Sequence, residues 1–207
     1  MDTETVAVTK MESFEQLLAE STRIHGHICA GQVIGVRMAM VALERIGIED
    51  PKGKDRKKLY VLVEIDRCAT DAIQSVTGCS LGKRSLRWLD FGVMAATFVN
   101  LETNRALRVT AREEARALSE SYCPEIMDKY QRQLEAYKLM PLEELFVFQE
   151  VTVQIKDCDM PGRPLRRVQC SQCGDWVQDC RELETEGQVI CRACAGERYY
   201  QVVDSAS

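Results

Sequence analysis

Residues 59–74 read LYVLVEIDRCATDAIQ and place a buried strand directly in front of a helix. Leu59 to Ile65 is a compact apolar run rich in β-branched residues, which predicts an inner strand. Ala69 to Thr77 has helical character and is followed by Gly78, a residue type that commonly ends helices. Asp66 to Asp71 therefore form a strand-to-helix turn, where side chains and helix-terminal N–H groups can converge on a ligand.

The segments on both sides of this turn predict a mixed order of helices and strands. Ser13 is a suitable cap for a helix from Phe14 to about Ser21, and a long buried helix is expected from Ala30 to Ile46. Trp88 and Phe91 are expected in the core. Further strands are predicted within 86–90 and within 93–101, another strand is expected to end at Val109, and a last strand is predicted over 146–155. Further helices are predicted over 111–122 and 124–138.

Composition and charge describe an ordinary globular chain. The 207 residues include 27 Lys and Arg against 32 Asp and Glu, and the net charge of −5 argues against a dedicated nucleic-acid binder. The longest mostly apolar run, Ile28 to Leu43, is too short for a bilayer and is interrupted by Arg37. Met1 to Lys10 lacks the pattern of a signal peptide. We therefore expect a cytoplasmic protein without a membrane segment.

The cysteines divide the chain into two parts. There are ten of them with only two histidines, and six lie in the last fifty residues. In a reducing compartment this usage indicates metal ligation or thiol chemistry rather than a disulfide framework. Pro161, Gly162 and Pro164 break regular structure ahead of that cluster. We predict a larger domain over residues 1–155 and a small module over 156–207.

The small module carries a four-cysteine zinc signature. Two CxxC pairs, Cys170 with Cys173 and Cys191 with Cys194, are separated by seventeen residues. Four thiolates satisfy a tetrahedral Zn²⁺ ion, and the tight turn of each pair lets both sulfurs reach one ion. A redox function of the CxxC pairs is the weaker interpretation. The module has seven Lys and Arg against nine Asp and Glu, so it offers no broad phosphate-binding face.

A second constellation lies near the N-terminus. Residues 25–31, HGHICAG, hold both histidines of the protein close to a cysteine. In an extended segment alternate residues point the same way, so His25, His27 and Cys29 could project from one side. Cys68 would complete a mixed set of metal ligands. The alternative is that the histidines cap the following helix and the cysteines pack as small apolar groups.

Four segments together resemble the FmdE family of proteins associated with formylmethanofuran dehydrogenase. They are residues 25–31, 64–74, 77–83 and 90–92, in the family's order. The resemblance implies an α+β domain with a mixed, roughly five-stranded sheet flanked by helices, usually dimeric, and a tail like the treble-clef zinc finger of some members. It also implies a metal-binding active site around His25 or His27, Cys29 and Cys68. The chain departs from the family pattern at Ala30, where proline is common, and at Val93, where lysine is common.

Three functional interpretations follow. The resemblance implies a metal-binding protein associated with molybdenum or tungsten formylmethanofuran dehydrogenase and its subunits. The candidate catalytic residues are Cys68 and His27 from the family motifs and Asp71 from its position beside Cys68. Asp66, Asp71 and Gln74 lie close enough to Cys68 to orient a ligating imidazole. A thiol redox or sulfur-carrier function would use Cys68 and Cys79, the latter in a glycine-flanked loop suited to an exposed thiol. A third possibility is a metal-delivery or partner-docking protein without catalysis.

The cofactors expected are one structural zinc and a second metal ion in the larger domain.

Overall fold

The computed structural model of the chain describes residues 12–203. Contacts divide the chain into two compact units, Met1–Val153 and Gln154–Ser207. Neither unit's described residues include a helix long and apolar enough to cross a membrane. Each unit is built around its own apolar cluster, so each is described by itself.

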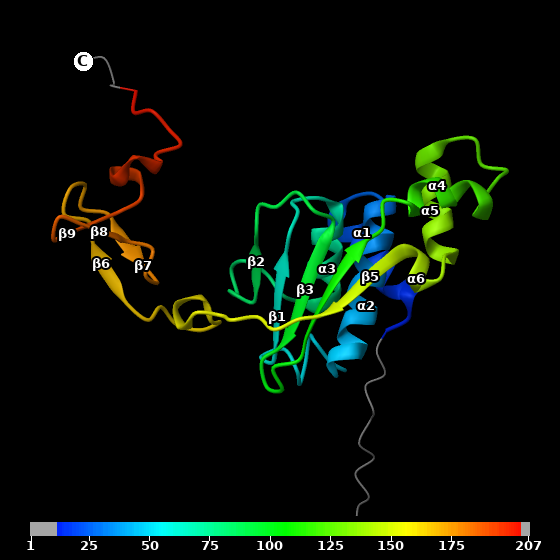
Figure 1. The fold of residues 1–207 in the computed structure, drawn as a ribbon, viewed down its shortest axis with the longest axis horizontal. Coiled ribbons are helices and arrows are strands. Elements are labelled where there is room, and N and C mark those ends of the chain that lie inside the picture. The colour runs from blue at the N-terminus through cyan, green and yellow to red at the C-terminus, as the bar shows by residue number, and fades with distance from the viewer. Residues whose placement is uncertain (1–11, 204–207) are drawn as a thin grey trace, which may run out of the picture. The chain divides into compact units, whose positions relative to one another are not determined.

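The N-terminal unit is an α+β domain with a mixed five-stranded sheet, as predicted (Figure 1). The strand order is β2-β1-β3-β4-β5, with β1 parallel to β2 and the remaining neighbours antiparallel. The strands are β1 (Leu59–Val63), β2 (Leu86–Trp88), β3 (Ala95–Asn100), β4 (Ala106–Ala111) and β5 (Phe146–Glu150). The helices are α1 (Phe14–His25), α2 (Ala30–Ile46), α3 (Cys68–Thr77), α4 (Ala115–Tyr122), α5 (Lys129–Leu139) and α6 (Leu142–Leu145).

Helix α2 is the centre of the core. Its residues Val33, Val36 and Leu43 are fully buried, and it packs against α1, α3 and α5 as well as against β3 and β4. Figure 1 shows α1, α2 and α3 together behind the sheet. The apolar strand residues Val61 and Phe98 belong to the same cluster. One continuous core therefore fixes the helices that carry the candidate site.

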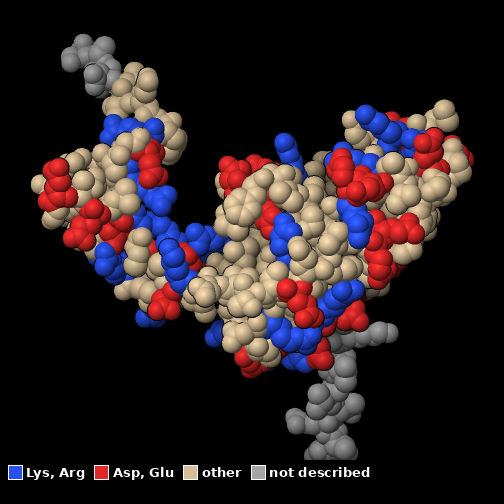
Figure 2. Space-filling view, viewed as in Figure 1, with Lys and Arg blue, Asp and Glu red and all other residues tan. Residues whose placement is uncertain are grey.

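Charged side chains of both signs are interspersed over the visible face of the N-terminal unit (Figure 2). Lys54 and Glu49 form an exposed ion pair of this unit, 2.7 Å apart. Exposed ion pairs of this kind contribute little to stability, because water screens both charges. The buried apolar cluster therefore decides the fold.

Several boundaries differ from the sequence-based prediction for identifiable reasons. The last strand ends at Glu150 rather than at 155, because its partner β4 begins at Ala106, opposite that end. The helix after residue 124 begins only at Lys129, where the Asp128 side chain accepts hydrogen bonds from the first-turn amides. The predicted cap at Ser13 is confirmed and is part of a capping box with Gln16.

Two expectations for side-chain burial were wrong. Trp88 is 45% exposed and Phe91 is 66% exposed. Trp88 lies on β2, which is an edge strand and is only three residues long, so its outer side has no neighbouring strand. Phe91 follows in the irregular segment between β2 and β3. An apolar residue in a short edge strand is therefore poor evidence for a core position.

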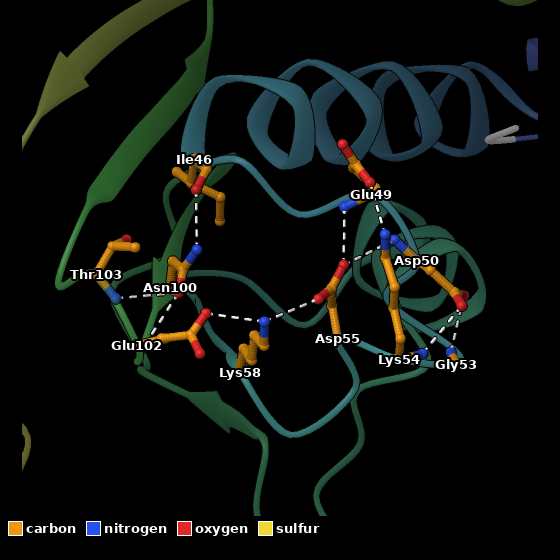
Figure 3. Close-up of polar contacts among 10 residues, drawn as sticks. All are labelled: Ile46, Glu49, Asp50, Gly53, Lys54, Asp55, Lys58, Asn100, Glu102 and Thr103. Carbon is orange, nitrogen blue, oxygen red and sulfur yellow. Dashed lines mark hydrogen bonds and ion pairs between the residues drawn. The ribbon is translucent and has the colours of Figure 1, made fainter. Parts of the chain in front are cut away.

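The loop between α2 and β1 is held by an acidic network (Figure 3). Asp55, only 5% exposed, accepts hydrogen bonds at 3.1 Å from the backbone amides of both Glu49 and Asp50. Lys58 joins Asp55 to Glu102 with ion-pair distances of 3.3 and 2.8 Å. This loop is thus internally ordered and ties the end of α2 to the start of β1.

The C-terminal unit consists of two hairpins and a short helical turn. Strands β6 (Arg167–Gln169) and β7 (Trp176–Gln178) pair with each other, as do β8 (Leu183–Thr185) and β9 (Gln188–Ile190). A 3-10 helix, η1 (Asp157–Asp159), precedes them, and a helical turn, η2 (Ala193–Glu197), follows. The two CxxC pairs lie at the β6–β7 turn and at the start of η2, which is the order of elements in a treble clef.

Candidate metal centres

Helix termini bring the N-terminal candidate residues together. His25 is the last residue of α1, Cys29 is the N-cap of α2 and Cys68 is the first residue of α3. Gly26 ends α1 in the left-handed conformation, with φ of 93°, and turns the chain directly toward α2. His25 is therefore helical, whereas an extended segment was expected, yet its imidazole still lies beside that of His27, with the ring centroids 4.6 Å apart.

One ligand atom from each of His25, His27 and Cys29 lies within 4.8 Å of the others, a group that could hold a metal ion. Nδ1 of His25 is 2.8 Å from Oδ2 of Asp71, on the first turn of α3. The other ring nitrogen, Nε2, is buried and has no hydrogen-bond partner among the described residues. A buried imidazole nitrogen without a partner is costly unless something binds it, so this atom fits a metal ligand.

Cys68 borders this group through Cys29. The two thiols are in hydrogen-bond contact, and burial, followed by this contact, raises the pKa of the Cys68 thiol. Cys68 is not one of the three residues that cluster within 4.8 Å, so the structure brings it to the edge of the group. Two neighbouring thiols and two imidazoles are donors that suit Zn²⁺ and other borderline metal ions.

Close packing of α2 on α3 makes this approach possible. A Cβ atom at Gly31 would lie 2.9 Å from Cβ of Cys68 and 3.7 Å from the Cys29 sulfur. A Cβ atom at Gly35 would lie only 2.4 Å from the carbonyl oxygen of Ala69. Since real Cβ atoms do not approach so closely, the two glycines let α3 bring Cys68 to Cys29.

Polar contacts that the sequence analysis missed hold the Cys68 backbone. Gln32 is fully buried; its Nε2 donates to the carbonyl oxygen of Cys68 at 2.6 Å, and its Oε1 accepts a hydrogen bond from Ser21. Thr70 donates to the carbonyl of Ile65 at 2.6 Å across the turn. A polar residue in the middle of an otherwise apolar helix face is the signal that could have identified Gln32.

The remaining predicted residues lie elsewhere. Asp66 is exposed, and neither it nor Gln74 is among the contacts of the His25 ring nitrogens. Cys79 is 3% exposed and its thiol lies 3.9 Å from the Leu59 carbonyl, so the expectation of an exposed thiol was wrong. Burial raises the pKa of Cys79 as well. The glycine-flanked loop that suggested exposure instead folds Cys79 into the core.

The four cysteines of the C-terminal unit form the second group within 4.8 Å. The sulfurs of Cys173 and Cys191 are 3.7 Å apart, and the amide of Cys191 donates to the sulfur of Cys170 at 3.3 Å. Backbone donors of Cys173 and Cys191 lower the pKa of Cys170 to about 6. The pKa of Cys173 is raised to about 12: the Asp175 amide lowers it, but burial and the neighbouring thiols outweigh that effect. Four such sulfurs ionise together only around a cation, which fits the predicted zinc site.

Comparison with known proteins places this site in a family. The family model described as "FmdE, Molybdenum formylmethanofuran dehydrogenase operon" matches residues 24–147. A probable S-adenosyl-L-methionine-binding protein of Archaeoglobus fulgidus is 30% identical over 213 residues, covering 91% of this chain and 54% of that protein. The chain thus spans about half the length of this relative.

A solved structure shares the fold. The crystal structure of an FmdE-like protein of the tungsten formylmethanofuran dehydrogenase type, from Syntrophus aciditrophicus, matches with a TM-score of 0.61 at 20% identity. The match covers 92% of this chain and 96% of that one. The family match spans more than half of the chain and contains the histidine and cysteine group together with Cys68 and Asp71. This chain belongs to the FmdE family.

Proposed function

We propose that this protein binds a metal ion through His25, His27 and Cys29, with Cys68 as a further thiol, and acts as an accessory protein in one-carbon metabolism of the formylmethanofuran dehydrogenase type. The observation that carries the metal site is the buried Nε2 atom of His25, which has no partner among the described residues and lies in a group of three ligand atoms. The link to a molybdenum or tungsten enzyme rests on the family description and on the name of the solved relative.

The residues around the ion would have separate tasks. Asp71 holds Nδ1 of His25, so that Nε2 faces the ion and the imidazole keeps its orientation. His27 is exposed and is the donor nearest to arriving ligands. Cys68 provides a thiol that would lose its proton and ligate the ion as a thiolate. When bound, the ion would supply Lewis acidity for a water or sulfur ligand.

Metal content per chain tests this proposal. Anaerobically purified full-length protein is expected to hold about two metal ions: one bound by the four-cysteine group, proposed as structural zinc, and one at the histidine site. Cys29→Ser and Cys68→Ser are each expected to hold one, and Cys191→Ser should retain only the histidine-site ion. Cys180→Ser removes a thiol outside both groups and should keep both ions. A full metal content in Cys29→Ser would refute the site.

Release of the ion separates an enzyme from a carrier. A carrier is expected to give up the histidine-site ion to a chelator within seconds, while an enzyme should retain it and turn over a substrate. The name of the Archaeoglobus relative adds S-adenosyl-L-methionine to the ligands for the screen. Formylmethanofuran dehydrogenase subunits are the partners to test by co-purification, and a second copy of this chain by light scattering.

A second candidate function is favoured by the contact between Cys29 and Cys68. With Cys79 buried, the thiol pair for a redox or sulfur-carrier activity becomes these two residues. Here a small-molecule disulfide would oxidise Cys29 and Cys68 to a protein disulfide in metal-depleted protein and be reduced to two thiols, and added metal would protect both cysteines. Two results together would favour the thiol activity over the metal site. Added metal would fail to protect Cys29 and Cys68 from oxidation, and Cys29→Ser would keep the full metal content.

A further inference from the structure

A second pair of thiols lies in the C-terminal unit, outside its four-cysteine group. Cys158 is in the middle of η1, and Cys180 lies in the turn between β7 and β8. Both are in the thiol form. Arg181, the residue after Cys180, reaches the Cys158 sulfur with Nη1 at 3.9 Å, and burial followed by the interaction with Cys158 raises the pKa of Cys180. Twenty-one residues of chain separate them, so tertiary structure creates the contact.

The turn that carries Cys180 has an unusual backbone. Asp179 and Cys180 both have positive φ, 55° and 57°, and the amide of Arg181 donates to the carbonyl of Gln178 at 3.3 Å. Residues other than glycine seldom adopt this conformation, and two in succession need support from the surroundings. Asp179 provides it, because its side chain accepts from the amide of Leu165 at 3.1 Å.

Arg181 joins the two segments. Its Nη1 lies 3.9 Å from the sulfur of Cys158 and 2.7 Å from the carbonyl oxygen of Asp179, while Nη2 pairs with the carboxylate of Asp159. One guanidinium therefore binds η1 and the β7–β8 turn at once. The two thiols are held in place before any reaction, which removes most of the entropic cost of joining them.

We propose that Cys158 and Cys180 are a site of reversible oxidation, at which a low-molecular-weight disulfide converts the two thiols into an intramolecular disulfide. One thiolate attacks a sulfur of the small disulfide, breaks its S–S bond and releases one small thiol. The second cysteine then loses its proton and attacks the mixed disulfide, which releases the second small thiol. Two protein thiols are oxidised and one small disulfide is reduced to two thiols.

The new bond would affect the four-cysteine group. It closes a loop that contains Cys170 and Cys173, the first pair of that group. A cross-link that encloses these two residues restricts the chain when the metal is absent. The oxidised unit is therefore expected to keep the β6–β7 hairpin, which lies inside this loop, after metal removal, whereas the reduced unit loses it.

Full-length, metal-loaded protein in glutathione buffers of increasing oxidised fraction provides the test. After an acid quench and alkylation, peptide mapping should reveal a Cys158–Cys180 linkage while the metal content is unchanged. Cys158→Ser and Cys180→Ser should each carry glutathione on the remaining thiol and lack the linkage. Arg181→Lys keeps a positive charge but not the fork that spans η1 and the turn, so the linkage should form at least several-fold more slowly.

Three results would overturn the proposal. One is oxidation of the four-cysteine group, with metal loss, before any linkage of Cys158 with Cys180. Another is that the Arg181→Lys variant and urea-unfolded protein both form the linkage as fast as the folded wild type. A preorganised pair must react faster in the folded wild type than in either of them. The third is a metal ion that is lost specifically in Cys158→Ser, which would make the pair a ligand set. A Cys29–Cys68 linkage is mapped separately and bears only on the proposed function.

Discussion

Nδ1 of His25 and Oδ2 of Asp71 are 2.8 Å apart and join the last turn of α1 to the first turn of α3. The imidazole side chain is 14% exposed and the carboxylate 47% exposed, so the pair lies at the rim of the site with the ring turned inward. Nδ1 of His25 is thus bound by Asp71, and Nε2 is available to bind a ligand.

Asp71→Asn should weaken metal binding at the histidine site by about 10- to 100-fold, because an amide orients the imidazole less strongly than a carboxylate. Chelator competition on protein with an intact four-cysteine group measures the change. Asp66→Asn removes the same charge from the same turn at an exposed position and should leave the affinity unchanged. Equal affinities for both variants would show that Asp71 does not position His25.

Gly35→Ala should lower the free energy of unfolding by about 1–3 kcal/mol, because the added methyl group would collide with Ala69 and Ala72 of α3. Alanine normally favours a helix over glycine by about 1 kcal/mol, so the clash must exceed that gain. Urea unfolding gives the value. Gly82→Ala, at a glycine with open space around it, is the control and should change stability by less than about 0.5 kcal/mol. A more stable Gly35→Ala protein would contradict the close packing.

Asp55→Ala should lower the free energy of unfolding by about 2–3 kcal/mol at neutral pH, because two backbone amides lose a charged acceptor. Burial alone would raise the pKa of Asp55, but the amides of Asp50 and Glu49 and the ammonium of Lys58 outweigh it and lower the pKa. A lowered native pKa gives stability that is complete above the unfolded value of about 4 and is lost as pH falls through the native value.

Urea unfolding at pH 7 and near pH 3 tests this. The difference in the free energy of unfolding between wild type and Asp55→Ala should be smaller at the lower pH. Asp90→Ala, which changes an exposed carboxylate, should show no such narrowing gap. A gap for Asp55→Ala that is constant with pH would mean that packing rather than charge explains the loss.

Loss of metal from the four-cysteine group should unfold the C-terminal unit and spare the N-terminal one. Structural zinc supplies on the order of 10 kcal/mol to modules of this kind, and the buried apolar residues here are few. Limited proteolysis of Cys191→Ser should cut within residues 154–207 and leave a stable fragment ending near Val153. Cys180→Ser should resist cleavage as the wild type does. A protease-resistant tail in Cys191→Ser would show that the module folds without its metal.

Sequence patterns predicted the elements of this fold better than their ends. The apolar run of β1 and the face of α2 are strong signals because burial decides them, and both are where they were expected. The end of β5 depends on where β4 begins, which no pattern within residues 146–155 contains. For the same reason the buried position of Cys79 was missed: its loop looked flexible, but the neighbouring strand β1 encloses it.

The sequence identified which residues belong to the candidate site but not how they come into contact. The two histidines stand out because both lie close to Cys29, and the CxxC spacing identifies the four-cysteine group directly. The contact of Cys68 with Cys29, in contrast, depends on how closely α3 approaches α2. Gln32, which holds the Cys68 carbonyl, is visible only once both helices are in place.

The close approach at Gly31 and Gly35 also has a consequence for the order of events during synthesis. His25 and Cys29 emerge from the ribosome about forty residues before Cys68 and Asp71, and α3 can dock only after β1 has been made. The histidine group can therefore be completed only after α3 has been made and has docked on α2. The four cysteines lie within 25 residues of one another and can capture an ion as soon as they emerge. If the proposed ions bind, the four-cysteine group would take its ion while the chain folds, and the histidine group would take its ion only after α3 has docked on α2.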